Sequence, residues 1–581
     1  MASTAGLELR DTPPSGAASP RLRLELQQHQ KHNVSRFLSC VRFGDGGCLI
    51  ADDLGLGKTC SSIACVEALR EAVKPEHGEF KTLFVVPKSV LDQWRAEILK
   101  FTFLEPSQIS LNWARVGARY QLVTYETLRA AFVDSYEKRD REWAPRTSSV
   151  HFCFLPDFFK CVVFDEVHRL RNKTAKVHHA ARFLGQTDKA NWVTPRLGLS
   201  GTPVVNGFAD MANIGAVLRF PRRFTEARFY ETMTAVTGVE FATSVFIKHF
   251  KSESLSLPDL VTSRHALTMS DEERAVHRGY VNALSNEVSN FNEHKCVAFT
   301  EVIVALVRLR QVALHPDLPL ATADARDAGD TDDESEDEFD EDDNVVTKKK
   351  KRKRAEDAHE RAAAARAVIE RIADTWRRST KLAWLVERAA LYRAEKRAFL
   401  VFTSFSTAAQ AVHIMLRAQG HRAALFVGST SDAARRDAVA AFQRGALDAL
   451  VLTYGAGGTG LHLAPAGTAV VHLDATWTPA AHEQAECRLH RCGTVRDVVN
   501  DYPVLEGSVD SYIYSNVHVK KQAYANALDR VVQHVRAKPV KANASAVNMQ
   551  QVLSLLRWFA TMNRQRKYDA IAQTTEVAVQ V

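Results

Sequence analysis

Short apolar runs alternate with longer amphipathic stretches in two separate parts of the chain. In the first part, continuous apolar residues predict strands at 83–86, 122–123 and 162–164, with helices at 59–70 and 89–100. The second part begins near residue 380, and its predicted strands are 398–402, 423–427, 449–452 and 469–473. Strands that alternate with helices are typical of parallel sheets covered by helices. The pattern therefore predicts an α/β protein with two parallel-sheet lobes.

The remaining segments differ from these lobes in composition. Between the lobes β-branched clusters thin out, and Val304, Leu306, Val307, Leu309 and Val312 predict an apolar helical face. From the N-terminus we expect a disordered tail (1–20), the first lobe (21–205), a helical insertion (206–320), a disordered charged linker (321–360), the second lobe (361–535) and a helical tail (536–581). A helix is predicted at 549–560 within that tail.

The net charge of +8 over 581 residues is a sum of unlike parts. Eleven acidic residues lie within 330–343, and 348–354 is entirely basic. The rest of the chain is more basic than the total indicates, which favours polyanionic partners without identifying one. The basic run 348–354 resembles a nuclear-import signal. The N-terminus lacks an apolar signal segment, and no run of about 18 apolar residues predicts a membrane span.

A glycine-rich loop follows the apolar run 48–51 and opens a predicted helix. Gly55 and Gly57 allow backbone N–H groups to approach a phosphate, and a helix N-terminus favours negative charge. Lys58 is placed to reach the β and γ phosphates, and Thr59 to bind Mg²⁺. Asp52 stands where the generic phosphate loop begins with glycine.

Two further groups complete the expected site. The apolar strand 161–164 delivers Asp165 and Glu166 at its carboxyl end, where α/β sheets place their ligands. Asp165 would hold Mg²⁺, and Glu166 would polarise an attacking water. Arg488 and Arg491 are one predicted helical turn apart, so both can face the charge of a transferring phosphoryl group.

In this order the motifs resemble those of a Swi/Snf-type ATPase of helicase superfamily two. Besides the loop, the acids and the arginines, the resemblance rests on Gln30, Val86-Pro87-Lys88-Ser89 with Trp94, Val123-Thr124-Tyr125-Glu126, Leu199-Ser200-Gly201-Thr202-Pro203, Leu309-Arg310-Gln311, Val401-Phe402-Thr403-Ser404-Phe405, Gly457-Gly458-Thr459-Gly460-Leu461 and Asp474 with Trp477. The compact length is similar to that of members encoded by large DNA viruses. The chain departs from the family at Val167, Cys487 and Thr494, and none of these departures removes a phosphate-handling side chain.

The resemblance implies two RecA-like lobes, ATP and Mg²⁺ as cofactors, and nucleotide binding by Gln30, Asp52, Gly55, Leu56, Gly57, Lys58 and Thr59. It implies catalysis by Lys58, Asp165, Glu166, Arg488 and Arg491, with Thr59 and Asp165 on the metal. Double-stranded DNA is the expected partner. The candidate residues for DNA contact and coupling are Lys88, Ser89, Thr124, Ser200, Thr202, Thr453, Gly458 and Gly460.

Three alternatives remain open at this point. The chain could be a helicase that separates strands of DNA or RNA, a nucleoside triphosphatase that assists transcription, or a nucleic-acid scaffold that only binds ATP. Nucleosomes and the transcription machinery are candidate further partners, and a membrane is not. The expected location is the nucleus, or the host nucleus for a viral protein.

Overall fold

The computed structural model describes residues 22–519, apart from 44–45, 74–78, 114, 140–141, 147–149, 156–157, 186–193, 234, 255–256, 295–298, 322–364, 458–462, 464–466 and 492. The predicted N-terminal tail, charged linker and C-terminal helix therefore lie outside the described residues. The chain forms two compact units, the first ending at Ser256 and the second beginning at Leu257.

The first unit is built on a seven-stranded sheet in which every neighbouring pair is parallel. Its order is β3 (Ile109–Ser110), β4 (Tyr120–Thr124), β2 (Thr82–Val86), β7 (Cys161–Asp165), β8 (Arg196–Leu199), β1 (Gly47–Ile50) and β9 (Phe246–Ile247). A separate antiparallel hairpin joins β5 (Tyr136–Arg139) to β6 (Glu142–Pro145). Because the strands are parallel, their carboxyl ends all meet at one edge of the sheet.

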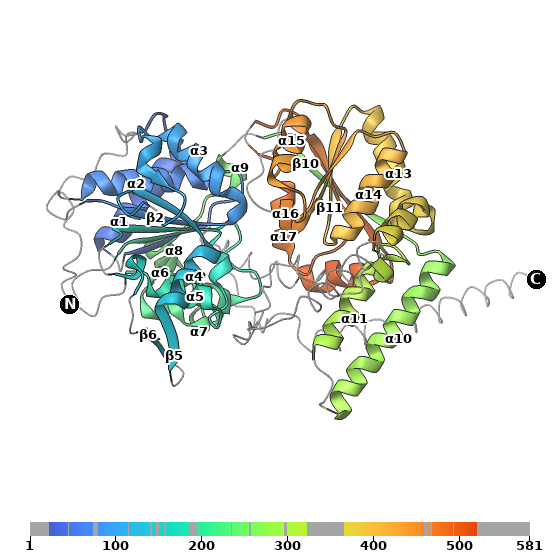
Figure 1. Cartoon of the computed structure of the whole chain (residues 1–581), viewed down its shortest axis with the longest axis horizontal. Coiled ribbons are helices and arrows are strands. Elements are labelled where there is room, and N and C mark those ends of the chain that lie inside the picture. The colour runs from blue at the N-terminus through green and yellow to red at the C-terminus, as the bar shows by residue number, and fades with distance from the viewer. Residues whose placement is uncertain are drawn as a thin grey trace, which may run out of the picture. The chain divides into compact units, whose positions relative to one another are not determined.

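Alternate residues of these strands pack on opposite faces, which explains their continuous apolar runs. Phe84 and Val86 join one core with α1 (Gln28–Phe43), α2 (Lys58–Ala72) and α3 (Leu91–Phe101). Leu83 and Val85 join the other core, with α4 (Tyr125–Ser135), α5 (Lys176–Phe183), α6 (Phe208–Leu218), α7 (Ala227–Glu231) and α8 (Ala235–Ser244). Helices therefore cover both faces of the sheet (Figure 1).

The second unit repeats this architecture with six parallel strands. Their order is β10 (Leu260–Leu267), β15 (Val498–Leu505), β14 (Gly467–His472), β11 (Ala398–Thr403), β13 (Ala449–Thr453) and β12 (Ala423–Phe426). One face is covered by α13 (Thr380–Ala394) and α14 (Ser406–Ala418), the other by α15 (Asp432–Gln443) and α17 (Pro479–Glu486).

A helical hairpin extends from the second unit (Figure 1). It consists of α10 (Asp271–His294) and α11 (Phe299–Val312), whose apolar faces share a core with α18 (Val509–Tyr512) and the end of β15. The helix predicted from the apolar face at 304–312 is therefore present.

The predicted α/β fold with two parallel-sheet lobes is confirmed, but the expected insertion at 206–320 is not one separate domain. Its beginning belongs to the first unit, where β9 pairs with β1. Its remainder belongs to the second unit, where all eight residues of β10 pair with β15. Backbone pairing decides this division, because each sheet satisfies its edge hydrogen bonds with a strand from this region.

Candidate active site

The glycine-rich loop lies between the end of β1 and the first turn of α2. Gly57 adopts a φ of 76°, and a Cβ there would lie 2.9 Å from Gln30 Nε2, so only glycine fits without strain. Gly55 also has a positive φ, of 95°. No described side chain caps the start of α2, so its first N–H groups are available for a phosphate.

The start of α1 contacts this loop. His29 Nε2 lies 2.9 Å from the Leu56 carbonyl oxygen, and Gln30 Oε1 accepts a hydrogen bond from the Gln27 N–H at 2.9 Å. Gln30 is buried. The predicted position of Gln30 beside the loop fits a base-reading role, and sequence reasoning missed His29.

Lys58 is half-buried at the start of α2 and faces the loop itself. Its Nζ donates to the Asp52 carbonyl at 2.8 Å and to the Asp53 carbonyl at 3.3 Å. Burial lowers the pKa of Lys58, while the carboxylates of Glu166 and Asp52 oppose that shift. Lys58 and Thr59 therefore both lie in the first turn of α2, next to the loop.

Asp52 acts as an internal support of the loop. It is fully buried, its Oδ1 accepts hydrogen bonds from the His249 backbone N–H at 2.9 Å and ring Nδ1 at 2.8 Å, and its Oδ2 accepts one from Asn33 at 2.7 Å. Burial would raise the pKa of Asp52, but the contacts with His249 and Asn33 outweigh it and the pKa lies below its usual value. His249 also approaches His32 on α1, with 2.9 Å between their ring nitrogens.

Asp165 and Glu166 stand at the end of β7, as predicted. Asp165 Oδ2 accepts from Trp94 Nε1 at 2.8 Å, and its Oδ1 accepts from the Glu166 N–H at 3.0 Å. Glu166 has a φ of 51°, an uncommon conformation for a non-glycine residue that turns the chain sharply after the strand. Burial, followed by the charge of Glu166, raises the pKa of Asp165 to about 7.

The two carboxylates fit a divalent cation. Burial and then the charge of Glu166 raise the pKa of Asp165, and a bound cation would offset both effects, while carboxylate and hydroxyl oxygens suit Mg²⁺. Among the described residues, no three His, Cys, Asp or Glu side chains gather as a metal cage built from protein alone would require. Mg²⁺ is commonly held by one or two protein oxygens together with substrate phosphates, and Asp165 and Thr59 could supply those oxygens.

A polar chain joins the acids to the end of β8. His168 Nδ1 lies 3.3 Å from Glu166 Oε2 and 3.0 Å from Ser200 Oγ. Ser200 Oγ also accepts from the Thr202 N–H at 3.2 Å. Ser200 and Thr202 are buried, and the Ser200 hydroxyl contacts His168 beside the acids. A part for these two residues in DNA contact or coupling stays a prediction.

The other candidate DNA contacts fall into three groups. Lys88 and Ser89 are exposed beyond the end of β2. The Thr124 side chain accepts from the Thr127 N–H at 3.1 Å and so caps α4, while Thr453 is fully buried. Gly458 and Gly460 lie outside the described residues. Of the described candidates, Lys88 and Ser89 are therefore the ones with the exposure that a phosphate contact needs.

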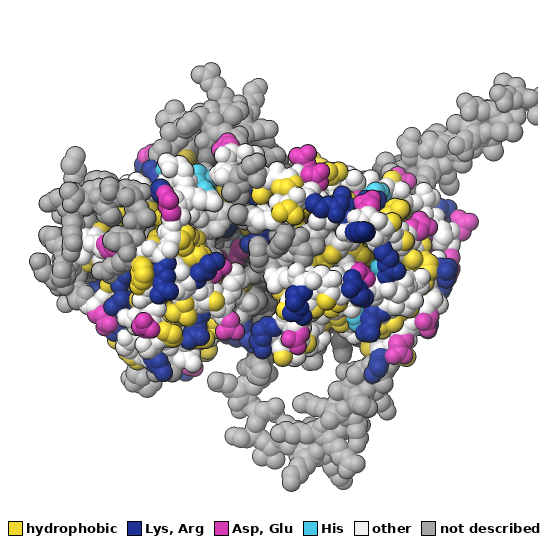
Figure 2. Space-filling view, turned by 90° about the horizontal axis from the view of Figure 1, so that it is seen from above, with side chains coloured by type: hydrophobic (Ala, Val, Ile, Leu, Met, Phe, Trp, Pro, Cys, Tyr) yellow, Lys and Arg dark blue, Asp and Glu magenta, His cyan; other side chains and the backbone are white. Residues whose placement is uncertain are grey.

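The charged surface does not by itself locate a partner. Figure 2 shows Lys and Arg side chains interspersed with Asp and Glu over the described residues of the face in view. On this face the Lys and Arg side chains are therefore mixed with acidic side chains.

Arg488 and Arg491 belong to the second unit. They follow α17, which ends at Glu486, so the prediction that both lie on one helix is wrong. The Arg488 N–H donates to the Ala485 carbonyl at 3.1 Å, so the chain continues after α17 as a hydrogen-bonded turn that carries both arginines. Thr494 closes that turn through a hydrogen bond from its Oγ1 to the Arg491 carbonyl at 2.7 Å. The departure from the family at Thr494 is thus accommodated structurally.

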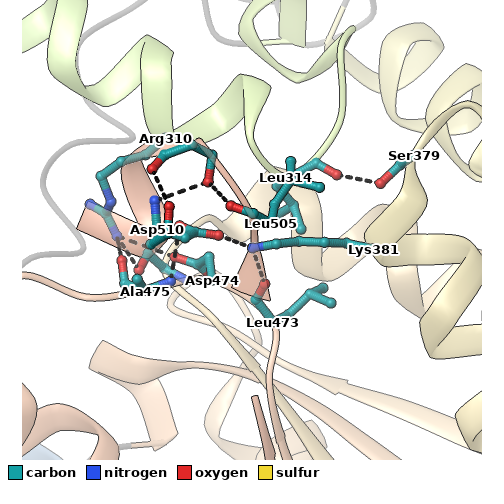
Figure 3. Close-up of polar contacts among 12 residues, drawn as sticks. Arg310, Leu314, Ser379, Lys381, Leu473, Asp474, Ala475, Leu505 and Asp510 are labelled. Carbon is teal, nitrogen blue, oxygen red and sulfur yellow. Dashed lines mark hydrogen bonds and ion pairs between the residues drawn. The ribbon is translucent and has the colours of Figure 1, made fainter. Parts of the chain in front are cut away.

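The second unit also contains a buried ionic cluster (Figure 3). Arg310 of α11 donates to Asp474 Oδ2 at 3.2 Å and to the Ala475 carbonyl at 2.9 Å. Lys381 of α13 donates to Asp510 and, at 2.9 Å, to the Leu473 carbonyl. All four charged side chains are at most 3% exposed, so their pairing fixes α11 and α13 against the end of β14.

Besides His29, sequence reasoning missed two residues that hold Asp52 at the start of the phosphate loop. Asn33 lies one turn after Gln30 on α1, within a run of polar residues from Gln28 to Asn33, so the sequence alone does not single it out. His249 follows the two-residue strand β9, nearly 200 positions after Asp52. No local pattern near His249 indicates this contact, because parallel pairing of β9 with β1 creates it.

Comparison with known proteins supports the same assignment. The SNF2-related domain matches residues 29–318, and the helicase conserved C-terminal domain matches residues 380–493. The chain belongs to the Swi/Snf-type ATPases of helicase superfamily two, a family of nucleic-acid-dependent ATPases. The expected family is thereby confirmed.

Individual relatives are distant in sequence. The chain is 24% identical over 529 residues to a putative ATP-dependent helicase/translocase of Bacillus subtilis, covering 86% of this chain and 48% of that protein. It is 26% identical over 486 residues to a probable global transactivator of Orgyia pseudotsugata multicapsid polyhedrosis virus, covering 81% and 84%. It is 22% identical over 535 residues to the human DNA excision repair protein ERCC-6, covering 84% and 31%. The chain thus spans about half of the bacterial relative.

In the part of the chain that the structure describes, no helix has both the length and the apolar character needed to cross a membrane.

Proposed function

We propose that this chain hydrolyses ATP in the presence of Mg²⁺ and uses the reaction to move along double-stranded DNA. The observation that carries the proposal is the meeting of Lys58, Asp165 and Glu166 at one sheet edge. Burial lowers the pKa of Lys58, and the charges of Glu166 and Asp165 both oppose that shift. The Lys58 Nζ atom lies 3.4 Å from the position that a Cβ on Gly201 would take. A phosphate chain on the uncapped start of α2 would therefore have a cation, two acids and the end of β8 around it.

Each residue has a proposed part in hydrolysis. Lys58 and the N–H groups of α2 bind the phosphates, and Asp165 and Thr59 hold Mg²⁺, which supplies positive charge against the phosphate oxygens. Glu166 orients and polarises the attacking water, and His168 at 3.3 Å restrains the Glu166 carboxylate. Arg488 and Arg491, as the resemblance implies, stabilise charge on the transferring phosphoryl group.

The choice of duplex DNA rests on the family and on the exposed loop at Lys88 and Ser89. Relatives named for DNA excision repair and for helicase or translocase activity favour DNA over other polyanions. Movement without sequence preference would depend on phosphate contacts, so binding should weaken steeply with salt. Transcription or nucleosomal complexes are candidate targets, and the basic run 348–354 favours a nuclear location, in the host for a viral source.

The test is the ATPase rate of the full chain with duplex DNA, single-stranded DNA and RNA. We expect the largest stimulation with duplex DNA and displacement of a triplex-forming strand without separation of the duplex. Stimulation by RNA alone would refute duplex translocation, and strand separation would identify a helicase. Binding of ATP without hydrolysis under all conditions would identify a scaffold.

Substitution of the acids and the lysine tests the site itself. Lys58→Ala removes the phosphate-binding cation and Glu166→Gln the water-polarising carboxylate, so each should lower turnover by at least about 100-fold. Glu166→Gln should still bind ATP in a filter or fluorescence assay, since Lys58 and Asp165 remain. The matched controls are the exposed Lys173→Ala and Glu142→Gln, which should leave turnover unchanged. Wild-type hydrolysis in either site variant would overturn the assignment.

A further inference from the structure

Trp94 makes a polar contact that packing alone does not require. It lies on α3, is 2% exposed, and its ring packs against Phe84 of β2 with centroids 5.4 Å apart. Its one polar atom, Nε1, donates to Asp165 Oδ2 at 2.8 Å. A buried indole normally finds a hydrogen-bond partner, but here the partner is a carboxylate of the ATP site, 71 positions away.

The surroundings of Asp165 show that several elements hold this residue. Its Oδ1 accepts from the Glu166 N–H at 3.0 Å, and its backbone carbonyl accepts from the Tyr125 hydroxyl of α4 at 2.5 Å. A carboxylate oxygen has two lone pairs, so each oxygen keeps one for a further ligand after accepting one hydrogen bond. The rotation of the carboxylate is thus restrained at both oxygens while each can still bind a cation.

We propose that Trp94 is a positioning residue that fixes the Asp165 carboxylate for Mg²⁺ through its indole N–H. The inference rests on the proposed function, in which Asp165 holds the metal. An indole suits this role because it is a neutral donor, whereas a lysine or arginine in the same place would compete with the cation for the carboxylate. Donors that orient a metal-binding side chain raise metal affinity without touching the metal.

Two substitutions separate the donor from the bulk of the ring. Trp94→Phe keeps an aromatic ring in the core but removes the N–H. Trp94→His removes the outer ring but keeps a nitrogen, Nε2, at the same place in the five-membered ring as Nε1 of tryptophan. A positioning role predicts that Phe is the more harmful change for the metal, while a packing role predicts that His is.

The readout is binding of Mn²⁺ to the full chain with ADP, measured from the electron paramagnetic resonance signal of free Mn²⁺. We expect Trp94→Phe to weaken Mn²⁺ binding about tenfold and Trp94→His to weaken it less. The matched control is Trp113→Phe, because the Trp113 indole nitrogen is buried in the same unit and has no hydrogen-bond partner among the described residues. That variant should bind Mn²⁺ as the wild type does.

A second measurement needs no stable variant. The chain has eight tryptophans, so a ¹⁵N-tryptophan-labelled sample gives few indole N–H signals in nuclear magnetic resonance spectra. Adding Mg²⁺ to the ADP complex should shift one of them, and that signal should be missing from whichever Trp94 variant folds. If no indole signal responds to Mg²⁺, the inference is overturned.

The remaining outcomes are also decisive. Equal Mn²⁺ binding by Trp94→Phe and wild type, or weaker binding by Trp94→His than by Trp94→Phe, would overturn the positioning role. Asp165→Asn distinguishes this from a failure of the proposed function. If Asp165→Asn weakens Mn²⁺ binding and Trp94→Phe does not, only the inference fails. If Asp165→Asn binds Mn²⁺ normally, the metal assignment in the proposed function is itself wrong.

Discussion

At the scale of single residues, the first position of the phosphate loop shows how a carboxylate is tolerated where phosphates are expected. Asp52 would repel a nucleotide if its oxygens faced the ligand. Both oxygens instead accept hydrogen bonds from His249 and Asn33, and the side chain is fully buried. The carboxylate therefore holds the start of the loop through His249 and Asn33, while the Asp52 backbone carbonyl accepts a hydrogen bond from Lys58.

This support can be removed one partner at a time. Asp52→Ala removes the acceptor of all three bonds, whereas His249→Ala removes only the ring donor and keeps the backbone N–H. A hydrogen bond to a charged acceptor is worth about 1.5–3 kcal/mol. We expect each variant to raise the KM for ATP about tenfold or more because the loop is less ordered. The double variant should be little worse than Asp52→Ala alone, since that change already removes the contact with the His249 ring. Additive losses in the ATPase assay would show that the two residues act independently.

The residues of the candidate site differ in how well the sequence alone predicts them. The loop from Gly55 to Thr59 and the acids after β7 are local motifs, so their spacing was sufficient to predict them. Asn33 and His249 act through long-range contacts to Asp52 that arise only when the strands pair. Trp94 was noted as part of a motif, but its bond to Asp165 depends on the packing of α3 on β2.

At the scale of elements, the strands predicted from apolar runs are buried on both faces, apart from the partly exposed edge strand β12. Four of the strands that escaped prediction have identifiable reasons. β8 contains a buried arginine and a glycine, β9 has only two residues, and β10 is a partly exposed edge strand. β15 carries the buried polar residues Asn500 and Asp501 within a central position. The end of α17 at Glu486 also escaped prediction, and beyond it Thr494 Oγ1 donates to the Arg491 carbonyl in a local turn.

The hydrogen bonds of Arg196 explain why the central strand β8 tolerates a buried cation. It is fully buried, and its guanidinium donates to four backbone carbonyls at the ends of α5 and α6: Ala181 at 2.9 Å, Arg182 at 3.3 Å, Leu184 at 2.5 Å and Val217 at 2.5 Å. Carbonyls at helix C-termini carry partial negative charge and have no partner within the helix. Arg196 therefore caps two helices at once.

Replacing this cap should destabilise the first unit. Arg196→Met leaves several buried carbonyls without a donor, and we expect a loss of about 2–4 kcal/mol in the free energy of unfolding. The exposed Arg182→Met on α5 is the control and should change it by no more than about 0.5 kcal/mol. Urea unfolding followed by circular dichroism measures both. Equal stability of the two variants would mean that the carbonyls find other donors.

At the scale of the whole molecule, each unit has cores of its own on both faces of its sheet. Three histidines buried in them are held neutral. Burial lowers the pKa of His178 in the first unit and of His277 in the second to about 4, and that of His472 to about 3. Unfolded histidine titrates near 6.5, so between about pH 6.5 and 4 the unfolded chain binds protons that the folded chain does not. Folding stability should therefore fall as the pH falls through this window.

A single substitution isolates one of these contributions. The His178 ring nitrogen Nδ1 donates to the Leu170 carbonyl at 2.7 Å, and glutamine can replace that donor without titrating. His178→Gln should lose less stability than the wild type between pH 7 and pH 5, by about 1–2 kcal/mol. Denaturant unfolding at both pH values tests this, and parallel losses in the two proteins would contradict a buried, neutral His178.

The buried pairs Arg310–Asp474 and Lys381–Asp510 have a mechanical consequence. They tie α11 and α13 to the end of β14, and the apolar core shared with α18 ties α10 to the same place. Separating these elements would leave charges uncompensated in a dry interior, which is costly. The α10–α11 hairpin must therefore travel with the second sheet as a rigid arm. A probe attached near the outer end of α10 would magnify rotations of that sheet during a catalytic cycle.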